Sequence, residues 1–370
     1  MIYLLAIVVT VVYGVLVLLM LWKWVKIPQS QANVVDDFFT TVLIPVRNES
    51  INLDRLIRSI QEGTTRSALY EIIVIDDHST DNTVEVVKSL KNKYPNVQLA
   101  QLPTGSEGKK AGIAYGVDLA MGEWIVCTDG DSEVAEGWLV EYRQMYQSGA
   151  QLAFGPVVLF NDSRKVGIEI LNQELAALVA MGGATLQMGK PTMINGCNYA
   201  FAKGVFGEVG GFDGNQKIAT GDDEFLLRKI FKAYPDRIRF IKSRQALVVS
   251  EPPASLSAFY HQRRRWASKW KFHQDWSSWV APVFMFFAYA VWCGFIATSM
   301  YERNWSFIGI LFVKAGIDYA YISTASRIQN RTISIFNFVI LQIIYPIYVV
   351  FFGVASNFGS YRWRERSHKI

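Results

Sequence analysis

The sequence is poor in cysteine, histidine and charged residues. Its 370 residues include three cysteines, four histidines and 19% charged residues. The cysteines are far apart and form no Cys-x-x-Cys pair, so neither a disulfide framework nor a zinc ribbon is expected. The 37 basic residues exceed the 32 acidic ones by too little to indicate nucleic-acid binding, and we expect no nucleic-acid partner. Apolar residues, in contrast, make up 51% of the chain. A content this high excludes a disordered chain.

The N-terminal end is a long apolar run. Residues 2–22 carry no charge, and Lys23 and Lys26 follow at once. About 20 helical residues span the hydrocarbon core of a bilayer, so the sequence predicts a transmembrane anchor at 1–26. A cleaved signal peptide would have a basic start and a small-residue cleavage site, which this run lacks. The lysines place the following domain in the cytoplasm by the positive-inside rule, as part of an integral membrane protein.

Apolar residues return near the other end of the chain. Residues 280–301 and 333–361 are two further runs without charge. Both are long enough to cross a bilayer. The sequence therefore predicts a C-terminal transmembrane region at 279–361.

The number of crossings in that region is open. The intervening segment, 305–326, carries Lys314 and Asp318 four residues apart, and reads as a span with an internal ion pair or as a re-entrant segment. Three crossings are favoured by length. They would leave the basic tail, 362–370, outside, against the positive-inside rule, whereas two would keep it inside.

Between the apolar ends, residues 33–254 alternate between strand-like and helix-like patterns. We expect strands at 38–46, 71–75, 97–102 and 124–127, with amphipathic helices between them. Such alternation is typical of a largely parallel sheet. In such sheets ligands bind beyond the carboxyl ends of the strands.

Polar clusters follow three of these strands, and the first is Arg47-Asn48-Glu49 after residue 46. Asp129 and Asp131 end the fourth strand, where two carboxylates suit Mg²⁺ or Mn²⁺ shared with a diphosphate. A solvated turn is the alternative. Asp76 and Asp77 end the second strand and suit a base N–H or a ribose hydroxyl, although nearby residues also suit the cap of the next helix.

Two further clusters lie later in the chain. Asp222 and Asp223 begin a predicted helix, where acidic residues are favoured electrostatically, but one could also accept a proton from a hydroxyl nucleophile. An amphipathic helix is expected at 255–278, and it brings Gln262, Arg265 and Trp266 together. The alternative is a helix that only binds lipid headgroups. Arg263 falls in its apolar arc and is expected to extend its charge to solvent.

Six segments occur in the order seen in one enzyme family: VLIPVRNES, VIDDHSTDNT, GKKAG, CTDGDSEV, GDDEFLLRKI and QRRRW. They resemble the membrane-bound family 2 glycosyltransferases, most closely the QxxRW group of cellulose, chitin and hyaluronan synthases. The resemblance implies an α/β GT-A fold, which is Rossmann-like, with flanking transmembrane helices. It also implies a metal-dependent inverting transfer from a nucleotide sugar, by default a UDP-sugar, to a lipid-linked or growing glycan acceptor.

The resemblance also assigns roles to residues. Asp223 matches the catalytic base, although the family's usual Glu-Asp reads Asp222-Asp223 here, so Asp222 remains a candidate. Asp131 matches the direct metal ligand, with Asp129 as its partner. The residues implied to bind substrate are Pro45, Arg47, Glu49, Asp76, Asp77, Lys109, Asp129, Asn198, Gln262, Arg265 and Trp266.

Two alternatives remain at this stage. A processive polysaccharide synthase is favoured by the QxxRW resemblance, but the few apolar helices favour a single transfer to a lipid. A non-catalytic nucleotide-binding membrane protein would not need an acidic base, which the Asp222–Asp223 pair supplies.

Overall fold

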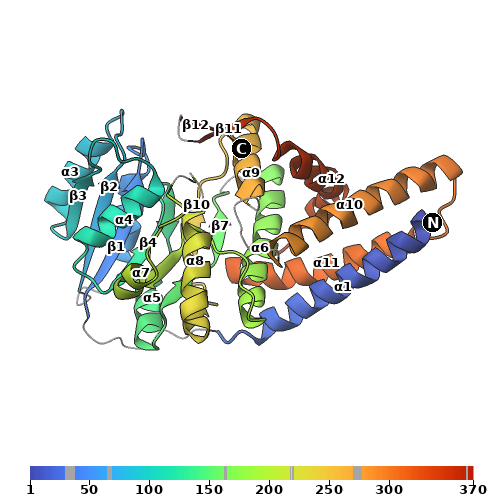
Figure 1. The fold of residues 1–370 in the computed structure, drawn as a ribbon, viewed down its shortest axis with the longest axis horizontal. Coiled ribbons are helices and arrows are strands. Elements are labelled where there is room, and N and C mark those ends of the chain that lie inside the picture. The colour runs from blue at the N-terminus through green and yellow to red at the C-terminus, as the bar shows by residue number, and fades with distance from the viewer. Residues whose placement is uncertain are drawn as a thin grey trace.

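The computed structural model describes residues 1–29, 38–64, 69–161, 165–216, 218, 221–269, 277–363 and 366–369. The chain folds into an α/β part and a helical part that extends away from it (Figure 1). The N-terminus lies at the far end of the helical part, whereas the C-terminus lies beside the α/β part.

A seven-stranded sheet forms the centre of the α/β part, in the order β3-β2-β1-β4-β8-β6-β9. The strands are β1 (Thr40–Val46), β2 (Tyr70–Asp76), β3 (Val97–Gln101), β4 (Trp124–Cys127), β6 (Leu152–Phe154), β8 (Tyr199–Ala202) and β9 (Ile238–Phe240). The four predicted strands are confirmed as β1 to β4, and they pair in parallel. The sheet is mixed overall, because β8 runs antiparallel to β4 and β6.

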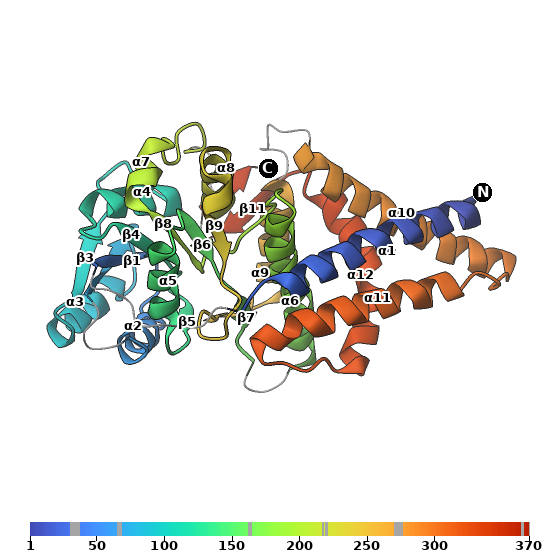
Figure 2. The same cartoon turned by 90° about the horizontal axis from the view of Figure 1, so that it is seen from below.

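Helices cover both faces of this sheet (Figure 2). One face carries α2 (Leu53–Glu62), α3 (Thr83–Lys93) and α5 (Trp138–Gln147), and the other α4 (Lys109–Leu119), α7 (Lys203–Glu208) and α8 (Asp222–Ala233). All seven residues of β1 are buried. This two-sided burial explains why the first strands read as continuous apolar runs rather than as alternating ones.

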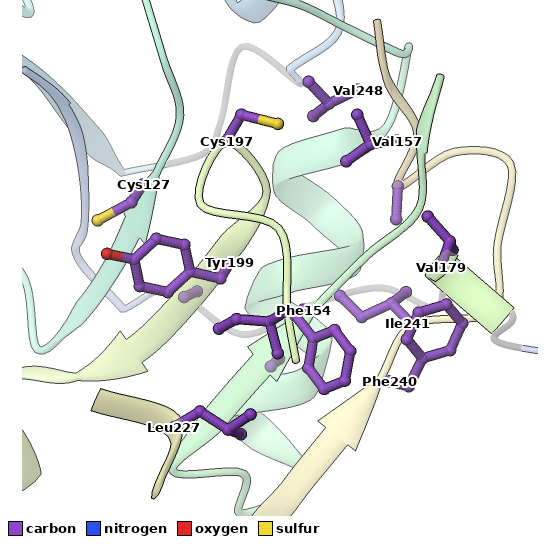
Figure 3. Packing of buried hydrophobic residues seen from close by; sticks show 14 of the residues in the cluster. Cys127, Phe154, Val157, Val179, Cys197, Tyr199, Leu227, Phe240, Ile241 and Val248 are labelled. Atoms are coloured by element: carbon purple, nitrogen blue, oxygen red, sulfur yellow. The ribbon is translucent and has the colours of Figure 1, made fainter. Parts of the chain in front are cut away.

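The hydrophobic core continues from the sheet into α6 (Val166–Gln187), a long helix between the two parts. Figure 3 shows Phe154 of the sheet and Val179 of α6 in one packed cluster. A three-stranded sheet lies at this junction, with β5 (Ser132–Val134), β10 (Val248–Ser250) and β7 (Val157–Leu159) in that order. A short 3-10 helix, η1 (Pro235–Arg237), precedes β9.

The helical part contains α1 (Ile2–Lys26), α10 (Ser277–Glu302), α11 (Gly309–Ser326) and α12 (Ile335–Ala355), with η3 (Arg327–Gln329) after α11. In the described part of the chain, three helices are long and apolar enough to cross a membrane: Ile2–Lys26, Trp279–Glu302 and Ile335–Ala355. All three match predicted apolar segments, although the last run ends as a helix at Ala355 rather than at residue 361.

The charges of α11 are paired inside the bundle. Lys314 Nζ lies 2.7 Å from Asp318 Oδ2, and both side chains are buried. The Tyr13 hydroxyl of α1 donates to Asp318 Oδ1 at 2.7 Å, and Gln342 of α12 contacts both charged groups. The predicted internal ion pair is therefore present, and it ties α11 to α1 and α12.

The last helix is not parallel to all of the others. Figure 2 shows α12 inclined to α1 and α11, and in both views it lies beside α10 and leads back towards α9 (Leu256–Ser268). A hairpin of β11 (Ser360–Trp363) and β12 (Arg366–Lys369) follows and lies against the α/β part. The number of C-terminal crossings stays a prediction, because α12 is itself long and apolar enough to cross a membrane.

Candidate active site

The carboxyl ends of the central strands open into a cavity of about 2190 Å³. Its polar wall comes from four separate segments and from α9, and it includes Glu49, Lys109, Asp129, Asp131, Asp222, Asp223, Gln262, Arg265, Trp266 and Lys269. Pockets for one small ligand occupy about 300–1,000 Å³. The cavity is large enough for two substrates side by side.

Asp129 and Asp131 follow β4, beside the end of β1, where the strand order reverses direction. Both carboxylates are half-buried and line the cavity. The turn between them needs Gly130, since a Cβ there would lie 2.8 Å from Val46 Cγ1 and 3.0 Å from Glu49 Cγ. The close approach of the β1 loop thus fixes where both carboxylates project.

These two carboxylates are hard oxygen ligands and fit Mg²⁺ or Mn²⁺. Among the residues that the structure describes, no group of three or more His, Cys, Asp or Glu is placed to hold a metal ion. A cation here would therefore take its remaining ligands from water and from a bound substrate, as is usual for Mg²⁺ beside phosphates.

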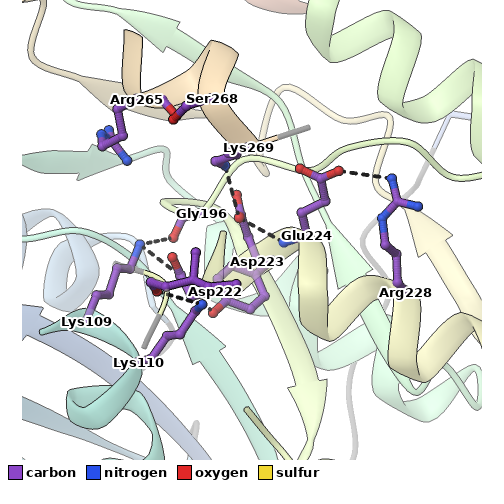
Figure 4. Close-up of polar contacts among 12 residues, drawn as sticks. Lys109, Lys110, Gly196, Asp222, Asp223, Glu224, Arg228, Arg265, Ser268 and Lys269 are labelled. Atoms are coloured by element: carbon purple, nitrogen blue, oxygen red, sulfur yellow. Dashed lines mark hydrogen bonds and ion pairs between the residues drawn. The ribbon is translucent and has the colours of Figure 1, made fainter. Parts of the chain in front are cut away.

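Lys109 links the acidic residues of two loops. Its Nζ lies 2.7 Å from Asp129 Oδ1 and 3.3 Å from Asp222 Oδ2, and donates to the Gly196 carbonyl at 2.7 Å (Figure 4). Burial by itself lowers the pKa of Lys109, but Asp129 and Asp222 outweigh it and raise the pKa above its ordinary value. The lysine is thus a fixed positive charge in the site.

Asp222 and Asp223 are both buried at the first turn of α8, but their surroundings differ. Burial raises the pKa of Asp222, yet Lys109, Lys269 and Lys110 together bring it below the ordinary value. Burial also raises the pKa of Asp223, and the negative charge of Asp222 raises it further. Lys269 lowers this pKa, but by less, so it stays above the ordinary value. Asp222 is therefore a fixed anion, whereas Asp223 is the more basic carboxylate.

The opposite wall of the cavity is α9. Gln262, Arg265 and Trp266 all line it, as the predicted helix face requires. Arg265 lies within electrostatic reach of Asp129, Asp222 and Asp223, and burial lowers its pKa. α9 therefore brings a guanidinium to the same space as the acidic residues.

Arg263 does not extend to solvent, so that prediction is wrong. Its guanidinium is buried and lies 2.7 Å from Glu174 of α6, between the rings of Phe259 and Trp266. The carboxylate of Glu174 makes burial of the charge possible. This pair fixes α9 to α6.

A second group of predicted residues lies at the end of β2. Arg47 Nη1 donates to the Asp77 carbonyl at 2.9 Å, and Gly108 N donates to Asp77 Oδ2 at 3.0 Å. Glu49 lines the cavity and accepts from Asn52 at 2.9 Å. The structure therefore brings Arg47 and Asp77 into contact beside the end of β2, and of the three only Glu49 lines the cavity.

Three predicted substrate-binding residues lie elsewhere. Pro45 is buried within β1, and Asp76 is buried and accepts from Ser79 N at 3.2 Å. Asn198 is fully buried, where its amide contacts Trp138, Tyr142, Pro156 and Ala246. In this structure these side chains contact protein groups, and their predicted contact with substrate stays a prediction.

Sequence reasoning assigned no role to two residues of the cavity wall. Lys269 Nζ lies 3.5 Å from Asp223 Oδ1, and its position seven residues after Gln262 placed it on the predicted helix face. Gly196 lies against both Lys109 and Asp223, since a Cβ there would be 3.1 Å from Lys109 Nζ and 3.2 Å from Asp223 Oδ2. No local pattern marks a glycine needed for such a contact.

Two family models match the chain. The model described as Glycosyl transferase family 2 matches residues 41–204, and that described as Glycosyl transferase family group 2 matches residues 124–353. The second model covers more than half of the chain. It includes both the Asp129-Gly130-Asp131 turn, called the DGD turn below, and α9.

Curated relatives agree with these models. The chain is 25% identical over 248 residues to the probable glycosyltransferase YdaM of Bacillus subtilis, across 65% of this chain and 57% of that protein. It is 30% identical over 115 residues to GalNAc(5)-diNAcBac-PP-undecaprenol beta-1,3-glucosyltransferase of Campylobacter jejuni, across 31% of this chain and 37% of that protein. The chain thus matches less than two thirds of the length of either relative.

The whole fold has a solved counterpart. The mannosyltransferase PcManGT of Pyrobaculum calidifontis, solved in complex with GDP-Man and Mn²⁺, is 18% identical with a TM-score of 0.59. The match covers 94% of this chain and 99% of that one. The likeness is one of fold, and it confirms the predicted α/β GT-A fold.

Proposed function

Because the chain belongs to glycosyltransferase family 2, we propose that it moves a sugar from a nucleotide-sugar donor to a hydroxyl of a lipid-linked or growing glycan acceptor at a membrane. The observation that carries the proposal is the single cavity lined by Asp131, Asp223 and Arg265. It places groups suited to a leaving diphosphate opposite a carboxylate suited to an acceptor hydroxyl.

The donor would lie between the DGD turn and α9. Asp131 and Asp129 would hold Mg²⁺ or Mn²⁺, which would neutralise charge on the leaving diphosphate. Arg265 and Lys109 would add fixed positive charge beside it, and Trp266 offers an apolar ring to a sugar. We keep UDP as the default nucleotide by resemblance, and GDP as the competing choice because the solved counterpart binds GDP-Man.

Asp223 would act as the base of an inverting single displacement. Its pKa is raised, so it accepts a proton more readily than Asp222 does. The hydroxyl oxygen would form a bond to the anomeric carbon as the bond to the phosphate oxygen breaks. The proton would pass to Asp223 and the electron pair to the nucleoside diphosphate.

The acceptor side of the cavity is apolar. Its wall continues from the carboxylates between the helices of the bundle, through Leu16 and Met20 of α1, Leu178 and Met181 of α6, and Phe284 of α10. Such a surface suits a lipid chain better than a hydrated polymer, so it favours transfer to a lipid-anchored hydroxyl over processive synthesis. A relative whose name specifies an undecaprenol-linked acceptor also supports this choice.

The same reasoning extends to the membrane. We place α1, α10 and α11 across the bilayer, with α12 crossing the bundle near the surface and the α/β part in the cytoplasm. Two C-terminal crossings return the basic tail to the side of Lys23 and Lys26, as the positive-inside rule requires. The charges of α11 are acceptable at depth because they are paired within the protein.

The direct test is a panel of donors incubated with purified protein in detergent, with Mn²⁺, Mg²⁺ or a chelator. Nucleotide release reports turnover, and the mass of the product separates a glycolipid from a polymer. We expect metal-dependent release with one nucleotide sugar and a product one sugar heavier than a lipid acceptor. Nucleotide binding without any transfer would instead favour a non-catalytic protein.

The base is tested by Asp223→Asn. Turnover should fall about 10²-fold or more, the usual loss for a general base, while the donor binds as before. The exposed Asp236→Asn is the control, and it should behave as the parent enzyme. Undiminished turnover in Asp223→Asn would remove this residue from the mechanism.

A further inference from the structure

Basic side chains gather where the helical part meets the α/β part. In both views the C-terminal ends of α1 and α11 reach this junction beside α6. The loop between β9 and β10, residues 241–247, lies against both helix ends. No step of the proposed transfer uses the cations of these three segments. They are Lys23, Lys26, Lys242, Arg244 and Arg327, which we call the basic collar.

Lys242 joins the loop to the end of α1. Its Nζ donates to the carbonyls of Trp24 at 2.6 Å and Ile27 at 3.2 Å, and it lies 4.9 Å from the ring centroid of Trp24. The last carbonyls of a helix have no partner within the helix, and the negative end of the helix attracts cations. The loop is therefore fixed to the end of α1 that carries Lys26.

Arg244 joins the same loop to the end of α11. Its Nε and Nη2 donate to the backbone carbonyl of Arg327 at 3.3 and 3.0 Å. Arg244 and Arg327 are both exposed, and so is Lys26 at the end of α1. Two exposed arginines are thus neighbours in space, although like charges repel. An anion bound at this point would relieve that repulsion.

Trp22 places the collar at the level of a membrane surface. Its ring is 50% exposed, and the Nζ atoms of Lys26 and Lys23 lie 4.1 and 5.0 Å from its centroid. Tryptophan beside lysine at the end of an apolar helix is typical of the boundary between hydrocarbon and headgroups. On the proposed topology the collar therefore lies at the depth of the headgroups on the cytoplasmic side.

The segments that form the collar carry charge of one sign. Residues 1–29, 241–250 and 319–334 contain no aspartate or glutamate. Arg331 follows α11 but is paired with Glu169 of α6, so it is not part of the collar. The collar therefore differs from the ion pairs inside the bundle, because its own segments do not supply the balancing charge.

We propose that the basic collar binds the phosphate groups of anionic phospholipids and so holds the α/β part at an anionic membrane surface. The inference goes beyond the proposed transfer and rests only on the membrane placement of α1 and α11. A guanidinium binds a phosphate through two hydrogen bonds. Each lysine or arginine near an anionic membrane surface also contributes about 5-fold to affinity.

A lipid surface fits the collar better than a free phosphate does. The cations are spread over the ends of two apolar helices, beside the exposed ring of Trp22. Such an arrangement contacts several headgroups at one depth, whereas a single phosphate ion would reach only a few of the cations. A zwitterionic lipid carries a positive charge next to its phosphate and should bind the collar more weakly.

The experiment measures lipid binding to the full chain in detergent by native mass spectrometry, with phosphatidylglycerol, phosphatidylcholine and inorganic phosphate as probes. The parent chain should bind phosphatidylglycerol about 10-fold or more tightly than phosphatidylcholine, and an equal concentration of inorganic phosphate should not displace it. Arg327→Gln should weaken phosphatidylglycerol binding about 5-fold, and so should Lys26→Gln. Arg327→Gln keeps the backbone carbonyl to which Arg244 donates, so its effect is not the loss of that contact.

The matched control is Arg303→Gln. It removes the same charge from an exposed position between α10 and α11, at the opposite end of the bundle, and should bind phosphatidylglycerol as the parent does.

Three outcomes would overturn the proposal. Equal affinity of the parent for the two lipids, or unchanged binding by both Arg327→Gln and Lys26→Gln, would show that the collar does not select anionic lipid. Displacement by inorganic phosphate would make it a phosphate site. An equal loss in Arg303→Gln would show dependence on net charge alone. These are binding measurements, so a failure of the proposed transfer in the donor panel would be seen separately.

Discussion

Buried charges occur in two arrangements in this molecule. In the helical part and at its junction with α6, two buried cations each contact one anion, in the pairs Lys314–Asp318 and Arg263–Glu174. We call these the balanced pairs. In the candidate active site Asp129, Asp131, Asp222 and Asp223 line one cavity, and we call them the acidic cluster.

The two arrangements of charge have different roles: the balanced pairs stabilise the fold, whereas the acidic cluster serves the proposed chemistry. A balanced pair satisfies its own charge, so its role is to hold helices together, and removing one partner leaves a charge buried without compensation. The acidic cluster instead shares its cations, since Lys109 contacts both Asp129 and Asp222, and Lys269 contacts Asp223. These groups line a cavity in which a metal ion and a phosphate could bind.

The largest effect should come from breaking a balanced pair. Glu174→Ala should lower the free energy of unfolding by about 3–5 kcal/mol, because Arg263 would remain buried without its partner. Chemical unfolding of the purified protein in detergent measures this. Glu169→Ala is the matched control on the same helix, because its pair with Arg331 is partly exposed and should contribute about 0–1 kcal/mol.

A rescue variant makes that result specific. Arg263→Met combined with Glu174→Ala removes both charges and should recover most of the lost stability. Equal destabilisation by the Glu169 and Glu174 variants would contradict the role given to burial.

The acidic cluster should respond in the opposite way. Asp131→Asn should lower Mn²⁺-dependent turnover about 10²-fold, as expected for losing a charged group at the leaving diphosphate. The free energy of unfolding should change little, since the Asp131 side chain is only half-buried. Asp118→Asn, exposed on α4, is the control. A large loss of stability in Asp131→Asn would place this residue with the structural charges instead.

The smallest effect concerns the pH dependence of turnover. Asp223 accepts a proton only when ionised, so turnover falls as the pH drops through its raised pKa. Lys269 opposes that rise, and Lys269→Ala should therefore move the acid limb of the pH–rate profile to higher pH. Lys232→Ala, exposed on α8, should leave the limb in place. A shift to lower pH would show that Lys269 does not act on the base.

Much of the α/β part could be predicted, because its signals are local. An apolar run followed by a polar turn identifies β1, β2 and β4 and places Asp77, Asp129 and Asp131 at one edge of the sheet. The pattern of α9 likewise predicted the shared face of Gln262, Arg265 and Trp266. In each case the spacing within one segment determines where the side chains project.

The rest depends on contacts between distant segments. The burial of Arg263 requires Glu174, which lies 89 positions earlier. The position of the C-terminal tail depends on the contact of Arg366 with Asp77, 289 positions away. Asn198 is polar and lies in a loop, so nothing local reveals that four buried groups satisfy its amide. The path of α12 also escaped prediction, because hydropathy measures how apolar a helix is and not its direction.

The packing of α1 against α10 and α11 has a consequence for biosynthesis. The ribosome completes α1 at Lys26 and reaches α10 only at Ser277, a delay of about 10–50 s at ordinary elongation rates. On the proposed topology α1 is stable as a single helix in the bilayer, because residues 2–22 carry no charge. When α11 emerges with Lys314 and Asp318, the hydroxyl of Tyr13 is already in place to receive it. The charged helix α11 is therefore made after its partner α1.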